Sequence, residues 1–267
     1  MAIFAIKPDT KMKKISFLVI FLGIFAFSVK AQTLDDSYYV AAYVWPSCHN
    51  DPRGQEILWP EGIGEWEVIK KGTPRFPGHY QPKQPLWGYE MDNDPKVMER
   101  WINLATDHGV NTFIFDWYWF EGEPFLESCV NDGFLKASNN TKMNFYLMWA
   151  NHDVKRNYWN VHRCPDDDSI LWRGATDEKN FRIIVDRVIR QYFTRPNYLK
   201  INGCPVFSIY KADNLIATFS GSMEKTREGL EYFRSQVRNA GFPDLHLQFV
   251  HGGPSTPEIQ KLLECLG

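Results

Sequence analysis

The chain has 267 residues, with 30 basic and 32 acidic side chains and a formal net charge of −2. This balance leaves no basic surface of the kind that binds nucleic acid or an anionic membrane, so we expect neutral or polar partners. HExxH, P-loop, GxSxG and EF-hand patterns do not occur, which argues against metal-dependent proteolysis, nucleotide hydrolysis and serine-esterase chemistry. We therefore expect no metal site and no cofactor.

The N-terminal segment has the pattern of a secretory signal peptide. Two lysines precede an apolar run over residues 15–27, and Val29 and Ala31 are the small residues of a cleavage site. The run is shorter than the roughly 20 apolar residues that span a bilayer. We predict cleavage after Ala31, export to the periplasm or the medium, and no membrane insertion afterwards; a retained anchor is the alternative. Met12 is a second candidate for the start of translation.

Removal of residues 1–31 takes away five lysines and one aspartate, which leaves 25 basic and 31 acidic side chains and a charge of −6. The exported chain would therefore be mildly acidic, and nucleic acid is not expected as a partner.

Beyond this segment, strand patterns alternate with helix patterns. Runs of β-branched and aromatic residues predict five strands, at 38–44, 110–115, 144–148, 205–210 and 245–250. Apolar residues at helical spacing predict helices at 94–108, 181–192 and 230–240, and a further one that begins at Thr256-Pro257. Asp94 should cap the first helix, with Pro95 in its first turn. This alternation predicts an α/β fold with a parallel sheet.

Loop lengths help to distinguish a barrel from an open sheet. The links that enter strands are short, whereas those that leave them are long, such as residues 45–93 and 150–176. A (β/α)8 barrel has this asymmetry; an open doubly wound sheet shares it but usually has a Gly-rich turn after its first strand. Residues 45–49 form no such turn. Because a closed barrel needs eight strands, we predict a partial (β/α)8 barrel over residues 32–267, truncated after about five βα units.

Two carboxylates follow the second predicted strand. Asp116 and Glu121 are the candidate catalytic residues, because a carboxylate at the C-terminal end of a barrel strand faces the active site and glycoside hydrolysis usually needs two of them. In the alternative interpretation, Asp116 orients neighbouring loop residues and Glu121 is solvated.

Nine of the ten tryptophans lie at strand ends or in the loops that follow. Flat aromatic rings can stack on the apolar face of a pyranose, although several of these rings could instead fill the core. Strand-end position gives these candidate sugar-binding residues: Trp45, Trp117, Tyr118, Trp119, Trp149, Asn151, His152, Tyr210 and His251.

The five cysteines include no CxxC pair, which removes support for a zinc ribbon or a redox motif. Export would permit a disulfide, and Cys48 with Cys164 is a conceivable pair because both fall in long loops. An odd count leaves at least one thiol free.

Several short motifs follow one another between residues 38 and 253. They are Trp59-Pro60-Glu61-Gly62, Gly64-Glu65-Trp66, Phe76-Pro77-Gly78-His79-Tyr80-Gln81-Pro82, Tyr118-Trp119-Phe120-Glu121-Gly122, Trp149-Ala150-Asn151, Arg195-Pro196-Asn197-Tyr198 and Asn202-Gly203-Cys204-Pro205. The ordered set resembles the glycoside hydrolase family 99-like group, also described as WbsX-type glycosyltransferases. The resemblance implies a (β/α)8 barrel that acts on glycans.

The resemblance adds Glu65, Trp66, His79 and Tyr80 to the candidate sugar-binding residues. It also implies the chemistry of the related endo-α-mannosidases, which retain configuration and use the 2-hydroxyl of the substrate as nucleophile. This chain departs from the family pattern in two ways. Family members often carry Asn where Glu121 stands, and their Asn-Glu-Trp stretch, with another Glu soon after it, has no counterpart here.

The leading hypothesis is an exported glycoside hydrolase that acts on a polysaccharide, endo-acting on α-linked, mannose-like sugars with retention. A glycosyltransferase of surface polysaccharide synthesis is the alternative; it would use cytoplasmic activated sugars and therefore fits the leader poorly. A non-catalytic glycan-binding protein or inactive fragment is the third possibility.

Overall fold

The computed structural model describes residues 38–250 together with 257, 260 and 261. All helices and strands named below belong to the compact unit that begins at Val40. The predicted signal peptide, His251 and most of the helix predicted at Thr256-Pro257 lie outside the described residues. None of the helices in the described part is long and apolar enough to cross a membrane.

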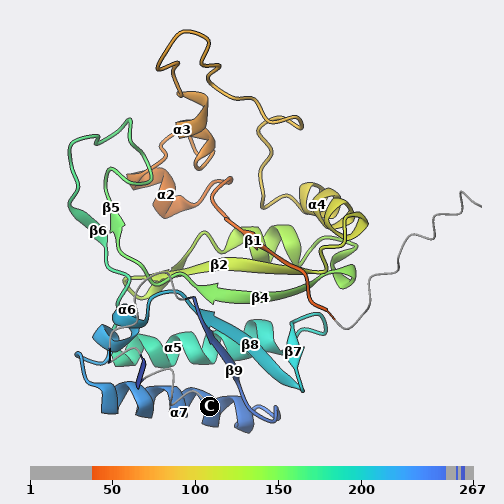
Figure 1. The fold of residues 1–267 in the computed structure, drawn as a ribbon, viewed down its shortest axis with the longest axis vertical. Coiled ribbons are helices and arrows are strands. Elements are labelled where there is room, and N and C mark those ends of the chain that lie inside the picture. The colour runs from red at the N-terminus through yellow and green to blue at the C-terminus, as the bar shows by residue number, and fades with distance from the viewer. Residues whose placement is uncertain (1–37, 251–256, 258–259, 262–267) are drawn as a thin grey trace, which may run out of the picture. The chain divides into compact units, whose positions relative to one another are not determined.

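Five parallel strands form the centre of the fold (Figure 1). They pair in chain order: β1 (Ala41–Val44), β2 (Thr112–Phe120), β4 (Asn144–Trp149), β8 (Cys204–Ile209) and β9 (His246–Phe249). The five predicted strands and the α/β class are therefore confirmed. Within the described residues the sheet is open and no closed barrel is present, because β1 and β9 are its two edges.

Helices follow the strands, as the apolar spacing predicts. The α-helices between strands are α4 (Pro95–Asp107), α5 (Glu178–Val188), α6 (Ala212–Thr218) and α7 (Met223–Asn239). The carboxylate of Asp94 accepts a bond from the backbone N–H of Lys96 at 2.8 Å, so the predicted cap of α4 is confirmed.

Three shorter helical segments complete this set. They are the π-helices η1 (Cys129–Phe134) and η3 (Ile189–Phe193) and the 3-10 turn η2 (Asn140–Lys142). The helix predicted at 181–192 therefore changes to π geometry in its last turn.

The core lies between one face of the sheet and the helices. Phe113 of β2 meets Phe134 of η1, Trp149 of β4 meets Phe181 of α5, and Phe207 of β8 meets Phe233 of α7. All six side chains are buried, and each contributes roughly 2 kcal/mol from removal of apolar surface from water. Because side chains alternate along a strand, every second residue of these strands faces away from the helices.

The long loops after the strands carry small elements of their own. The loop after β1 contains α2 (Pro52–Ile57) and α3 (Trp66–Lys70), and the loop after β4 contains the hairpin of β5 (Val154–Lys155) and β6 (Ile170–Trp172). Cys48 and Cys164, the conceivable disulfide pair in these two loops, are both free thiols.

Two tight hairpins complete the fold. β3 (Glu123–Phe125) returns antiparallel along the end of β2, and β7 (Lys200–Ile201) precedes β8. Asn202 and Gly203 form the turn between β7 and β8; both residues have positive φ, 53° and 80°, as a two-residue hairpin turn requires.

Candidate active site

A cavity of about 350 Å³ opens at the carboxyl ends of β1, β2, β4 and β8. Its lining residues come from those strand ends and from the loop after β4: Trp45, Asp116, Tyr118, Met148, Ala150, His152, Tyr158, Tyr210 and Lys211. Five of them, Trp45, Asp116, Tyr118, His152 and Tyr210, are candidate site residues from the sequence. The structure therefore brings together predicted residues that lie up to 165 positions apart in the chain.

Asp116 faces this cavity because of its place in β2. The strand alternates, so Asp116 and Tyr118 point away from the helices while the residues between and beside them point into the core. Oδ1 of Asp116 is buried and has no hydrogen-bond partner, and the hydroxyl of Tyr118 is likewise unpartnered. Burial raises the pKa of Asp116 to about 7. Near neutral pH the Asp116 carboxyl group is therefore protonated in a large share of the molecules and can donate a hydrogen bond.

Aromatic rings form the walls around Asp116. Trp45 meets Tyr118 edge-on, with ring centroids 5.7 Å apart, and meets Trp159 in the same way at 5.6 Å. On the other side, His152 meets both Tyr118 and Tyr210 edge-on. Perpendicular rings support one another's orientation, so the walls of the cavity are held by mutual packing.

The side chain of Trp45 is also held from behind. Its Nε1 donates to Oε2 of Glu65 at 2.7 Å, and the hydroxyl of Ser47 donates to the same oxygen at 2.7 Å. Burial raises the pKa of Glu65, although these two hydrogen bonds act in the opposite direction. Glu65 therefore fixes the indole from outside the cavity and does not line it.

Gly64 makes the approach of Glu65 possible. Its φ is +60°, and a Cβ at this position would lie 1.9 Å from the carbonyl oxygen of Ser47. Only glycine avoids that overlap while adopting a left-handed backbone. The backbone N–H of Glu65 can therefore donate to the same carbonyl at 2.9 Å and bring its side chain under Trp45.

His152 is neutral at physiological pH. Burial lowers the pKa of its imidazole, and Nδ1 lies 3.0 Å from the backbone oxygen of Asp153. A carbonyl oxygen only accepts, so Nδ1 carries the proton and Nε2 is left as an acceptor. The ring can therefore accept a hydrogen bond from a hydroxyl group.

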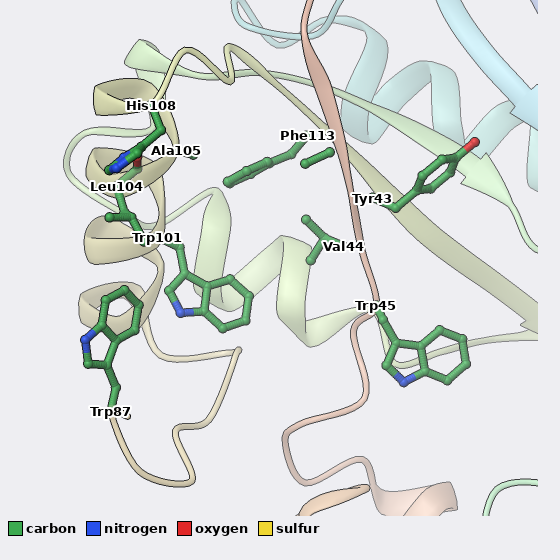
Figure 2. Close-up of a pocket in the computed structure, with 10 residues that line it drawn as sticks. Tyr43, Val44, Trp45, Trp87, Trp101, Leu104, Ala105, His108 and Phe113 are labelled. Carbon is green, nitrogen blue, oxygen red and sulfur yellow. The ribbon is translucent and has the colours of Figure 1, made fainter. Parts of the chain in front are cut away.

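A second, larger cavity of about 570 Å³ lies beside the edge strand β1 (Figure 2). Its lining is almost wholly apolar, and Figure 2 shows the indole of Trp101 pointing from α4 toward Val44 on β1, with Trp87 on the far side of that indole. No carboxylate lines it, so we assign the chemistry to the cavity around Asp116. Trp45 lines both cavities.

Other predicted sugar-binding tryptophans lie in the core. Trp117, Trp119 and Trp149 are at most 3% exposed, and each occupies a strand position that faces the helices. Trp117, for example, donates its indole N–H to Glu127 at 2.8 Å. These three rings fill the core and do not line either cavity.

Glu121 lies outside the cavity as well. It stands in the turn between β2 and β3 with φ 54°, its side chain is 66% exposed, and it pairs with Arg53 at 3.3 Å. The structure therefore separates it from Asp116, and the interpretation of Glu121 as a solvated turn residue fits this placement.

Asn151 has a structural role. Its side-chain oxygen accepts a hydrogen bond from the backbone N–H of Lys211 at 2.7 Å, and its side-chain nitrogen donates one to the carbonyl of the same residue at 2.8 Å. The remaining candidates are not lining residues. Trp66 donates to the carbonyl of Glu90 at 2.6 Å, His79 stacks on Phe76 at 4.6 Å, and Tyr80 is exposed.

Four lining residues are not among the candidates predicted from the sequence: Met148, Ala150, Tyr158 and Lys211. Three of them could have been found, because Met148, Ala150 and Lys211 lie at or just beyond the ends of β4 and β8. Tyr158 could not, since it reaches the cavity from within the long loop after β4. Among the described residues, no group of His, Cys, Asp and Glu is placed to hold a metal ion.

The family to which these features belong is identified by sequence comparison. The sequence model of the family described as "Glycosyltransferase WbsX" matches residues 40–263. The chain belongs to the WbsX family. The resemblance inferred from the ordered motifs is therefore confirmed, and with it a family of glycan-active enzymes.

Two curated relatives have no assigned activity. Both are the uncharacterized protein WxcX of Xanthomonas campestris pv. campestris, from strains B100 and ATCC 33913. Each is 26% identical over 215 residues, which cover 80% of this chain and 28% of the relative. The chain thus spans less than a third of the length of the curated relatives it matches.

Solved structures show a weaker likeness. The GH99 endo-alpha-mannosidase of Bacteroides thetaiotaomicron, in complex with bis-tris propane, is 16% identical with a TM-score of 0.34, covering 67% of this chain and 43% of that one. A glycoside hydrolase-like protein is 15% identical with a TM-score of 0.41, covering 79% and 51%.

Proposed function

We propose that the cavity around Asp116 binds a glycan and that Asp116 donates a proton to the glycosidic oxygen during hydrolysis. One observation carries this proposal: a carboxyl group with a buried, unpartnered Oδ1 and a pKa of about 7 faces an aromatic-walled cavity at the ends of parallel strands. Carboxylic acids that act as general acids in glycosidases are tuned in this way by burial.

The walls support sugar binding in particular. The rings of Trp45, Tyr118 and Tyr210 provide apolar surface for the C–H face of a sugar, while Nε2 of His152 accepts from a hydroxyl group. Membership of the WbsX family supports a carbohydrate as the substrate.

Hydrolysis by two carboxylates needs a second one beside the scissile bond. Of the described residues that line the cavity, Asp116 is the one carboxylate. We therefore assign it the role of proton donor and no nucleophile among the described residues. Attack by the 2-hydroxyl of the substrate, retention, and endo action on an α-linked, mannose-like polymer stay predictions from the motif resemblance.

The test compares matched variants of the 267-residue chain on α-mannan and other polysaccharides, with reducing-end release and binding measured separately. Asp116→Asn should lower release at least 100-fold, as loss of a general acid does, while affinity changes by no more than a few-fold. Glu121→Gln, whose residue is outside the cavity, should match the wild type. If Asp116→Asn released reducing ends at the wild-type rate, the proposed role of Asp116 would be refuted. If the wild type bound the polysaccharides but released no reducing ends, a glycan-binding protein would be favoured.

Transfer of an activated sugar is the second candidate, favoured by the description of the family as a glycosyltransferase. Titration with nucleotide sugars separates the two: saturable binding that a free nucleotide abolishes would support transfer, and its absence would support hydrolysis.

We also propose export of the chain through cleavage after Ala31. Cell fractionation with N-terminal sequencing of the product tests this. An extracytoplasmic protein that begins at Gln32 supports it, and a cytoplasmic product that retains residue 12 contradicts it.

A further inference from the structure

We propose that the cavity around Asp116 selects a sugar that carries an anionic group, a carboxylate or a phosphate ester, and that Lys211 binds this group. The inference rests on the proposed glycan binding and names the substrate class of the same site. It starts from an unneutralised cation in the lining of the cavity.

Lys211 is held at the cavity by its backbone. It follows the last residues of β8 and precedes α6, and the side-chain amide of the buried Asn151 bonds to both its N–H and its carbonyl group. Within the part of the chain that the structure describes, no carboxylate forms an ion pair with it. Its ammonium group is close enough to His152 to contribute to the lowered pKa of that imidazole, after the larger effect of burial.

Glu65 and Asp153, two carboxylates close to the cavity, already have partners. Glu65 receives hydrogen bonds from Trp45 and Ser47. Asp153 pairs with Arg173 at 3.8 Å and accepts the backbone N–H of Gly174 at 2.8 Å. These partners leave the charge of Lys211 available to a ligand.

Asp116 is the remaining carboxyl group, and its partly protonated state suits the same ligand. In its neutral form it adds a hydrogen-bond donor and no negative charge to the cavity. The lining groups that face it from β1, β2, β8 and the loop after β4 are aromatic or neutral, apart from Lys211. An anion in this cavity therefore meets one cation, one carboxylic acid and hydroxyl groups.

A neutral sugar would gain less from Lys211. An ammonium group donates a hydrogen bond to a hydroxyl as well as to an anion, but only a carboxylate or phosphate adds the Coulomb attraction between opposite charges. The ammonium group therefore discriminates the anion from the neutral group. Binding of an anion also favours the protonated form of Asp116. Affinity for an acidic sugar should therefore fall as pH rises through about 7, where Asp116 loses its proton.

The experiment measures calorimetric affinities of the full chain for three probes: trigalacturonate, glucose 1-phosphate and the neutral mannotriose. The wild type should bind at least one acidic probe about ten-fold more tightly than mannotriose, the gain expected from one charge-assisted bond. Lys211→Met should abolish this preference and leave mannotriose binding within about two-fold. Lys225→Met, which removes an exposed lysine of α7, is the matched control and should behave as the wild type.

The outcomes separate the two proposals. An equal loss for acidic and neutral probes in Lys211→Met, or no loss for either, overturns the anionic selectivity while glycan binding stands. Failure of the wild type to bind any of the three sugars overturns the glycan site itself. Preference for trigalacturonate identifies a uronate as the source of the anion, and preference for glucose 1-phosphate identifies a phosphate ester.

Discussion

The indole nitrogen of Trp45 lies 2.7 Å from Oε2 of Glu65, and this hydrogen bond ties a wall of the Asp116 cavity to the turn before α3. The same oxygen also accepts the hydroxyl of Ser47. One half-buried carboxylate therefore sets the orientation of the ring that a sugar would meet.

Replacement of this carboxylate should affect both stability and binding. Glu65→Leu leaves the indole N–H and the Ser47 hydroxyl without an acceptor, so we expect a loss of roughly 1–3 kcal/mol in the free energy of unfolding, together with weaker glycan binding. Glu65→Gln keeps an acceptor oxygen and should lie between Glu65→Leu and the wild type. Urea denaturation and calorimetric titration measure the two effects. An unchanged affinity in Glu65→Leu would show that Trp45 needs no such support.

The raised pKa of Asp116 predicts a pH-dependent stability. Its folded pKa of about 7 exceeds the ordinary value of about 4, so the unfolded chain releases this proton at lower pH than the folded chain does. The contribution of Asp116 is therefore fully present below about pH 4 and is lost as pH rises towards 7. Asp116→Asn lacks this component and should gain stability relative to the wild type between pH 5 and 8, on the order of 1–3 kcal/mol after allowance for partial exposure.

Urea denaturation at several pH values measures this gain, and Asp132→Asn, at an exposed ion pair with Lys136, is the control. A difference between Asp116→Asn and the wild type that stays constant with pH would contradict the assignment.

Two glycines with positive φ make a matched pair. Gly64→Ala places a Cβ against the carbonyl of Ser47, whereas Gly78→Ala meets nothing within 4 Å at a φ of +81°. Gly78→Ala should cost about 1 kcal/mol, the strain of a left-handed alanine. Gly64→Ala should cost several kcal/mol more and should also weaken glycan binding, because Glu65 moves with the turn. Thermal melts of both variants check this, and equal melting temperatures would refute the close approach.

A buried hydrogen bond between His49 and Asp92 anchors the loop after β1. Nδ1 of His49 lies 2.5 Å from Oδ1 of Asp92, and both side chains are fully buried. Asp92→Ala leaves the buried imidazole without its hydrogen-bond partner and should lower the free energy of unfolding by roughly 1–3 kcal/mol. Asp132→Ala breaks an exposed pair and should cost less than 1 kcal/mol. Chemical denaturation of the two variants tests this contrast. Similar losses in the free energy of unfolding would show that the buried pair stabilises the fold no more than the exposed pair does.

The fold could be predicted from the sequence because its strands and helices differ in apolar period. The predicted end of β2 was wrong: the strand continues from Phe115 to Phe120, since pairing with β4 and β3 extends it through a carboxylate that would otherwise suggest a loop. Side chains along β2 alternate between its two faces, and this alternation separates the site from the core. Asp116 and Tyr118 share one face, and Trp117 and Trp119 share the other, a distinction that strand-end position alone does not make.

The remainder of the site depends on contacts that no local pattern contains. Tyr158 and Trp159 reach Trp45 and Tyr118 from more than 35 positions away, through a loop whose path is set by the packing of its own hairpin. The bond between Glu65 and Trp45 likewise depends on the conformation of Gly64.

Trp45 forms part of the lining of both cavities. A ligand in the apolar cavity beside β1 and a sugar at Asp116 would therefore contact the same residue. If one ligand shifts this residue and so changes the affinity for the other, the second ligand must change the affinity for the first by the same factor.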